Sequence, residues 1–167
     1  MILSFSEYLK NQGLNTDKDK SIINYIDKNR FDNIRYLIIG KVGTGKTVLA
    51  KQICFWRKKI FIKITPDKIS KIMPEDISGW YENIDIIIYD DLGAELIEER
   101  EKVVNILLII SRYLENSSKG LIITTNLGSD ELREYYGDRI FDRIVGQLKI
   151  LKLNQPSYRK QNMEIIK

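Results

Sequence analysis

The chain has 167 residues, 43% of them hydrophobic and 30% charged, and its 27 basic and 23 acidic residues give a formal net charge of +4. This length and this balance of residues predict one globular domain with a sizeable core. A net charge of this size gives only weak support for a polyanionic partner. A single cysteine excludes an intrachain disulfide and the absence of histidine excludes a zinc site of the usual kind. No apolar run approaches the roughly 18 residues of a membrane span and the start lacks a signal-peptide pattern, so we expect a cytoplasmic protein without membrane contact.

Two short amphipathic helices are predicted before the first strand, over residues 2–12 and 18–29. Thr16 or Asp17 would cap the second helix. We therefore divide the chain into a short N-terminal helical extension, residues 1–33, and a main domain, residues 34–167. The extension either packs against the edge of the sheet or docks a partner, and the apolar faces of its helices favour packing.

The strongest pattern is G-x-x-x-x-G-K-T over residues 40–47, directly after the apolar run Tyr36–Ile39. A strand entering this pattern predicts a phosphate-binding loop that opens a helix. Backbone N–H groups at a helix N-terminus cradle phosphates, and glycine permits their close approach. Lys46 would reach the β- and γ-phosphates, and the hydroxyl of Thr47 would bind Mg²⁺. We predict that the nucleotide is bound by Gly40, Val42, Gly43, Thr44, Gly45, Lys46, Thr47 and Val48.

The next elements are a helix from Lys46 to about Arg57 and a strand over 60–64. The basic triplet Arg57-Lys58-Lys59 suits a helix C-terminus, and a contact with a nucleic-acid phosphate is the alternative. Prolines at 66 and 74 predict an irregular segment over residues 66–81 with a short helix around 67–72. We single out this segment as a functional insert.

Two adjacent carboxylates end the apolar strand predicted over Ile86–Tyr89. The carboxyl ends of strands in an open α/β sheet are where ligands bind. Asp90 is predicted to hold Mg²⁺, directly or through water. Asp91, on the other side of the strand, is predicted to face the γ-phosphate and to orient or deprotonate the attacking water.

After residue 97 the sequence predicts a buried helix over 98–116, a strand over 121–125 and a helix from a Ser129 cap to about Tyr136. Asn126 follows the strand at the same edge as the two aspartates, where it would position water or contact the γ-phosphate; an asparagine of a turn at the strand end is the alternative. Arg139 and Arg143 lie one helical turn apart. They are either functional or pair with Asp138 and Asp142. Residues 148–153 alternate as a half-exposed edge strand does.

With these patterns in place, the chain resembles the AAA+ ATPases, and among them the helicase loaders of the DnaC and DnaI type and the transposon proteins of the IstB type. The resemblance runs from Ile34 to Arg159 through five motifs in the family's order: GKVGTGKT, IIIYDDLGAE, IITTN, GDRIFDRI and SYRKQ. It implies an α/β, three-layer P-loop NTPase fold (AAA+/ASCE) with a five-stranded parallel sheet in the order 5-1-4-3-2. No C-terminal lid domain is expected.

The resemblance also implies ATP and Mg²⁺ as ligands and nucleotide sites shared between subunits of a ring or spiral. Asn126 would be the sensor 1 residue, Arg143 an arginine finger acting in trans on the neighbour's γ-phosphate, and Arg159 the sensor 2 residue that contacts nucleotide in cis. The residues expected to act in catalysis are Lys46, Asp91, Asn126 and Arg143. Because many relatives carry glutamate in place of Asp91, and because the finger comes from a neighbour, we expect weak hydrolysis by an isolated subunit.

The resemblance suggests a replicative helicase and single-stranded DNA as partners, with Lys63, Lys68 and Lys71 near DNA phosphates. Three alternatives stay open. An IstB-like transposition helper would use the same motifs, and a nucleotide-gated adaptor would bind ATP with little turnover. A small phosphotransferase would need a basic lid and an acceptor pocket, and the sequence indicates neither.

Overall fold

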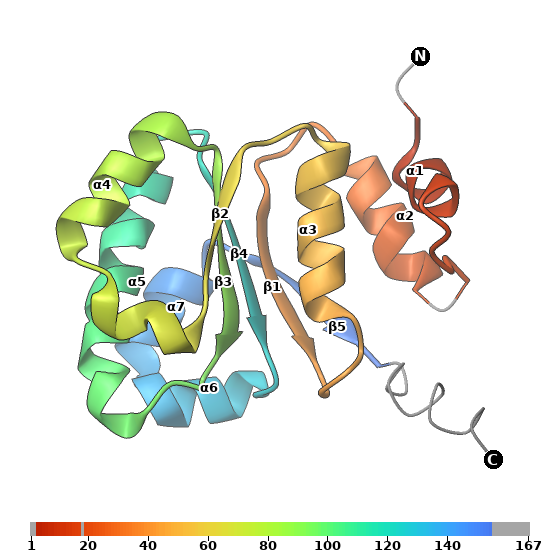
Figure 1. The fold of residues 1–167 in the computed structure, drawn as a ribbon. Helices are drawn as coiled ribbons and strands as arrows, with labels where there is room; N and C mark the ends of the chain where they lie inside the picture. The colour runs from red at the N-terminus through yellow and green to blue at the C-terminus, as the bar shows by residue number, and fades with distance from the viewer. Residues whose placement is uncertain (1–2, 18, 155–167) are drawn as a thin grey trace.

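Five parallel strands form the centre of the fold, with helices on both faces (Figure 1). The structure is a computed structural model and describes residues 3–17 and 19–154. The strands are β1 (Arg35–Gly40), β2 (Phe61–Ile64), β3 (Ile86–Leu92), β4 (Gly120–Thr125) and β5 (Lys149–Leu153). They lie in the order β2-β3-β4-β1-β5, and every neighbouring pair is parallel. Read from the other edge this is 5-1-4-3-2, so the predicted sheet and fold class are confirmed.

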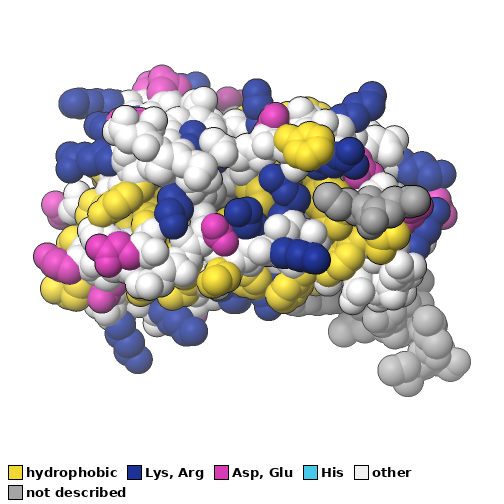
Figure 2. Space-filling model, turned by 90° about the horizontal axis from the view of Figure 1, so that it is seen from above, with side chains coloured by type: hydrophobic (Ala, Val, Ile, Leu, Met, Phe, Trp, Pro, Cys, Tyr) yellow, Lys and Arg dark blue, Asp and Glu magenta, His cyan; other side chains and the backbone are white. Residues whose placement is uncertain are grey.

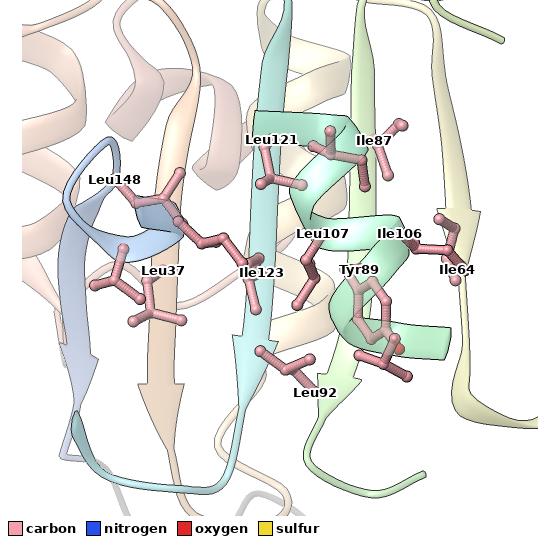
Figure 3. Close-up of a cluster of buried hydrophobic side chains, with 14 of the residues drawn as sticks. Leu37, Ile64, Ile87, Tyr89, Leu92, Ile106, Leu107, Leu121, Ile123 and Leu148 are labelled. Carbon is pink, nitrogen blue, oxygen red and sulfur yellow. The ribbon is translucent and has the colours of Figure 1, made fainter. Parts of the chain in front are cut away.

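Alternation along the strands divides the core between two helical layers. One layer consists of α4 (Pro74–Asn83), α5 (Arg100–Glu115), α6 (Ser129–Tyr136) and α7 (Asp138–Val145). Its cluster includes Ile87 and Tyr89 of β3 and Leu121 and Ile123 of β4, which meet Leu107 of α5 (Figure 3). Because all these side chains are almost fully buried, the carboxyl edge of the sheet rests on a firmly packed base.

The second layer holds α3 (Lys46–Trp56) and the N-terminal helices α1 (Phe5–Asn11) and α2 (Lys20–Lys28). Phe5 is completely buried and its ring lies 4.9 Å from that of Trp56. The indole N–H of Trp56 donates to the carbonyl of Leu3 at 3.0 Å, and the N–H of Phe5 donates to Asp27 Oδ1 at 2.7 Å. Both N-terminal helices thus share the core that α3 forms with the sheet.

The connection between β2 and β3 is more regular than the sequence suggested. A 3₁₀ helix, η1 (Pro66–Lys71), is followed by α4, which starts at Pro74. Proline suits the first helical position because the N–H it lacks would have no helical partner there. The carboxylate of Asp76 accepts a hydrogen bond from the N–H of Met73 at 2.7 Å and so caps the N-terminus of α4. The expectation of an irregular chain beyond residue 72 is therefore wrong.

Another correction concerns the charges of α6 and α7. Asp138 and Asp142 do not pair with Arg139 and Arg143 as the alternative supposed. They pair instead with Arg133, at 3.1 and 2.8 Å. Arg133 also stacks over the ring of Phe141, 4.3 Å from its centroid. One arginine of α6 therefore braces α7 along its first two turns.

The surface at the amino ends of the strands lies opposite the phosphate loop and is seen in Figure 2. Lysine and arginine side chains gather there beside exposed hydrophobic side chains. None of the helices in the described part of the chain has the length and apolar character needed to span a bilayer.

Candidate functional site

The predicted phosphate loop joins the carboxyl end of β1 to the start of α3. Gly43 and Gly45 have φ angles of 82° and 90°, left-handed values that favour glycine. A Cβ on Gly40 would come within 2.7 Å of the Thr44 hydroxyl and 3.0 Å of the Leu153 carbonyl. Side chains larger than hydrogen would thus distort the loop at all three positions. The backbone fits a cradle for phosphate at a helix N-terminus, as the motif predicts.

Lys46 extends inside this loop, and its side chain is buried. Its ammonium donates to the carbonyl of Gly40 at 2.8 Å, to the carbonyl of Lys41 at 3.2 Å and to Oδ1 of Asn126 at 2.7 Å. Asn126 follows β4, so this contact joins the phosphate loop to the neighbouring strand. The structure therefore brings together two residues that lie 80 positions apart in the sequence.

Asp90 forms the second half of the site, at the carboxyl end of β3. Its Oδ1 accepts the hydroxyls of Thr47 at 2.7 Å and Thr124 at 2.8 Å, and its Oδ2 pairs with the Lys63 ammonium at 3.1 Å. Burial acts to raise the pKa of Asp90, but the hydrogen bonds from Thr47, Thr124 and Lys63 outweigh it, and the pKa lies below its usual value. Asp90 is therefore held as a carboxylate.

The oxygen atoms around Asp90 are of the kind that binds Mg²⁺. A hydroxyl and a carboxylate oxygen lie 2.7 Å apart on Thr47 and Asp90, and Mg²⁺ prefers such oxygen ligands while keeping several waters. No cluster of three or more His, Cys, Asp or Glu that would make a protein-only metal cage exists among the described residues. The residues present thus fit a cation held jointly by the protein and phosphate oxygens.

Asp91 lies at an irregularity in the pairing of β3 with β4, between Tyr89 and Leu92. Its φ is 56°, a left-handed value that is uncommon outside glycine but tolerated by aspartate. Its N–H donates to the Thr124 hydroxyl at 2.9 Å. The same threonine therefore holds the carboxylate of Asp90 and the backbone of Asp91. The half-buried Asp91 carboxylate has no hydrogen-bond partner within the described residues.

The arginines of α7 lie apart from this cluster. Arg143 is exposed on the other helical layer, with one guanidinium nitrogen 3.7 Å from Glu115 Oε1. Arg139 is also exposed and has no ion pair with any residue in the described ranges. Arg159 lies outside the described residues. The structure thus brings Lys46, Thr47, Asp90 and Asn126 together and leaves Arg143 on the surface.

Three residues in or beside the site make contacts that were not predicted from the sequence. Lys63, predicted near a DNA phosphate, lies instead on β2 against Asp90. Thr124, within the strand predicted over 121–125, contacts both aspartates. Glu95, four residues beyond Asp91, is a buried carboxylate that accepts the N–H of Gly93 at 2.9 Å. The polar run that ends the strand over 121–125 contains Thr124, and the motif IIIYDDLGAE ends on Glu95, whereas no sequence signal places Lys63 beside Asp90.

Comparisons with known sequences identify a family and relatives of the chain. The model of the family described as IstB-like ATP binding protein matches residues 7–165. The chain is similar to the replicative helicase loader DnaC of Escherichia coli strain K12, with 28% identity over 140 residues. It is equally similar to DnaC of Buchnera aphidicola, with 28% identity over 141 residues. These matches cover 75% of this chain and 56% of either relative, so the chain spans little more than half the length of the curated relatives it matches.

Solved structures show the same fold. The crystal structure of the DnaC helicase loader superposes with a TM-score of 0.62 and 20% identity, covering 84% of this chain and 92% of that one. The replication initiator DnaA bound to AMPPCP and single-stranded DNA gives a TM-score of 0.65 and 18% identity, covering 89% of this chain and 52% of that one. At such identities these likenesses support the arrangement of the sheet and its helices.

Proposed function

Because the chain belongs to the family of IstB-like ATP binding proteins, we propose that it is an AAA+ ATPase of the helicase-loader type that binds ATP with Mg²⁺ and hydrolyses it. One observation carries the proposal: Lys46 contacts Asn126 while Thr47 contacts Asp90. A cation, a polar amide, a hydroxyl and a carboxylate from three elements thus meet at one edge of the sheet. This set serves phosphoryl transfer, in which positioning and charge stabilisation provide most of the catalysis.

Each residue has a role that its position supports. The loop N–H groups and Lys46 hold the β- and γ-phosphates, and Lys46 exchanges its carbonyl partners for phosphate oxygens. Asp90 and Thr47 hold Mg²⁺, which when bound neutralises charge on the phosphates. Asp91 takes the proton of the attacking water or orients that water, and Asn126 keeps Lys46 and the water in place. Val42 and Val48, both largely exposed, flank the nucleotide.

We assign Arg143 to a neighbouring subunit's site, because no described contact joins it to its own phosphate loop. Its pair with Glu115 is long and solvent-exposed, so releasing it costs little. An arginine finger is worth roughly 10³–10⁵ in rate, so the isolated subunit should turn over slowly. Arg139, one turn earlier on α7 and also exposed, is the second candidate for this role. Arg159 remains proposed as the cis contact.

The test is ATP hydrolysis by mixtures of two inactive variants. Lys46→Ala removes phosphate binding and keeps the finger, whereas Arg143→Ala keeps the phosphate loop and removes the finger. If Arg143 acts in trans, each variant alone is inactive and their mixture recovers about a quarter to a half of the wild-type rate, since mixed neighbours rebuild complete sites. Wild-type specific activity should also rise with protein concentration.

Arg30→Ala is the matched control, because Arg30 is exposed in the connection between α2 and β1 and its guanidinium stacks on Phe31. This variant should hydrolyse ATP as the wild type does. A rate independent of concentration and unchanged in Arg143→Ala would overturn the trans role and favour a monomeric phosphotransferase. Tight ATP binding without turnover in any mixture would favour the nucleotide-gated adaptor.

For partners we propose a replicative helicase and single-stranded DNA, in keeping with the relatives named as helicase loaders. The exposed lysines 68 and 71 of η1 are the proposed DNA contacts. Charge-reversed Lys68→Glu/Lys71→Glu should weaken binding of a labelled oligo(dT) about tenfold or more at low salt and reduce the salt dependence. Lys10→Glu on α1 is the control. Equal affinity in all three proteins would remove this surface as the DNA site, and DNA binding with a transposase instead of a helicase would support the IstB-like alternative.

A further inference from the structure

Glu95 is a buried carboxylate that touches neither the phosphate loop nor a cation in the described structure. Only 7% of its surface is exposed. Its Oε2 accepts the N–H of Gly93 at 2.9 Å, and its Oε1 accepts the hydroxyl of Tyr136. Carboxylates are seldom buried unless hydrogen bonds or charges compensate for the lost hydration. Two segments that are 41 residues apart in the sequence meet at this side chain.

At one end of the contact is the turn that follows the proposed catalytic Asp91. Asp91 and Gly93 both have left-handed φ angles, 56° and 92°. A Cβ on Gly93 would come within 2.5 Å of Leu127 Cδ1, so the turn also lies tightly against the segment that follows Asn126. With Gly93 fixed by Glu95 and the N–H of Asp91 fixed by Thr124, the conformation of Asp91 is specified from both sides.

At the other end is the arginine-bearing helix. Tyr136 is the last residue of α6, and Gly137, with φ of 85°, leads directly into α7. Arg133 of α6 holds Asp138 and Asp142 of α7. The two helices are therefore one braced unit that carries Arg139 and Arg143. Burial, and after it the hydrogen bond to Glu95, raises the pKa of Tyr136 far above its usual value, so its hydroxyl remains a donor at any physiological pH.

We propose that Glu95 is a positioning residue that couples the Asp91 turn to the α6–α7 unit. A change at the γ-phosphate that moves Asp91 moves Gly93, Glu95 and Tyr136 with it, and so shifts the helix that presents Arg143 to the next subunit. This inference rests on the proposed ATPase function. It adds a direction of communication: from the nucleotide bound by a subunit to the arginine surface of that same subunit.

The test uses Tyr136→Phe, which removes the hydroxyl and keeps the ring, with Tyr135→Phe as the matched control. Tyr135 is the preceding residue of α6, and its ring stacks with Arg100 while its hydroxyl has no hydrogen bond within the described residues. Amide hydrogen exchange in residues 129–145 is measured with and without a non-hydrolysable ATP analogue and Mg²⁺. In the wild type and Tyr135→Phe the nucleotide should change exchange there by about tenfold or more, and in Tyr136→Phe this change should vanish while nucleotide affinity stays within about twofold.

Steady-state kinetics give an independent readout. Glu95→Ala should lower kcat about tenfold to a hundredfold with little change in KM, because misplacing Asp91 harms the reaction more than binding. Glu95→Gln, which keeps one acceptor oxygen, should recover part of the loss. Glu98→Gln, an exposed glutamate on the same segment, should match the wild type.

Two failures are distinguishable. A wild type that binds no nucleotide overturns the proposed function and this inference with it. A wild type that binds nucleotide but shows no change of exchange in residues 129–145, or a Tyr136→Phe variant that changes as the wild type does, overturns the inference alone. An unchanged kcat in Glu95→Ala does the same.

Discussion

Asp91 is the residue at which backbone conformation and proposed chemistry coincide. Replacing its carboxylate should lower the hydrolysis rate by about 10²–10⁴-fold without preventing ATP binding, because the loss falls on water activation. Its φ of 56° adds a second, separable effect. Alanine in this conformation should cost roughly 1 kcal/mol of unfolding free energy, whereas glycine and asparagine adopt it readily.

Three variants separate these effects. Asp91→Asn and Asp91→Gly should lose activity with little change of urea midpoint, and Asp91→Ala should lose both activity and stability. Measuring ATP binding, turnover and urea unfolding on all three decides the matter. Turnover that persists in Asp91→Asn would remove Asp91 from catalysis and place the reaction on other groups.

The sequence indicates those residues whose proposed chemistry is tied to a spaced motif. The contacts of Lys46 with Asn126 and of Thr47 with Asp90 bring four motif residues together at one edge of the sheet, and their roles in binding and catalysis stay predictions. The contacts of Lys63 and Glu95 were not predicted, because they depend on which strands and helices become neighbours. Lys63 contacts Asp90 only because β2 lies beside β3. A single lysine in a short strand does not indicate which strand will be its neighbour.

Among the helices, α3 ends in a way that sequence alone left ambiguous. Lys58 has a φ of 51°, and its N–H donates to the carbonyl of Phe55. The N–H of Lys59 donates to the carbonyl of Cys54. This is the Schellman pattern, in which glycine usually follows the helix. Lys58→Gly should therefore raise the free energy of unfolding by about 1 kcal/mol, since a side chain in the left-handed region is strained.

Urea unfolding of Lys58→Gly beside Lys59→Gly provides the check. Lys59 has no positive φ and pairs with Asp85 at 3.4 Å, so its replacement should stabilise nothing. If both glycines destabilise the protein equally, the left-handed turn after α3 is not present in solution.

The start of α4 shows why an element boundary was missed. Pro74 was taken as a sign of irregular structure, although proline at the first helical position suits the start of a helix.

Across the whole molecule, Cys54 reports on the integrity of the core. It is the only cysteine in the sequence, and its side chain lies completely buried on the inner face of α3. Burial raises the pKa of its thiol to about 12, and thiols react as thiolates. Ellman's reagent should therefore label the native protein slowly at pH 8 and the denatured protein at once. Rapid labelling without denaturant would show that the α3 layer opens readily.

The N-terminal helices decide how many units fold together. Phe5 is fully buried against Trp56, and its own N–H is bonded to Asp27, so α1, α2 and α3 share one apolar cluster. Phe5→Ala should lower the free energy of unfolding by about 3–5 kcal/mol, as large-to-small changes in packed cores do. Phe31→Ala is the control, because that ring is 81% exposed and its loss should change the free energy by less than about 0.5 kcal/mol.

Urea unfolding followed by tryptophan fluorescence and by circular dichroism measures both variants. Coincident transitions with a large loss in Phe5→Ala would mean that residues before β1 unfold together with the sheet, as a structural part of the same domain. A partner could then reach only the outer surface of α1. Equal stabilities of Phe5→Ala and Phe31→Ala would contradict this packing and free the extension to act as a docking segment, because its apolar face would then be available to a partner protein.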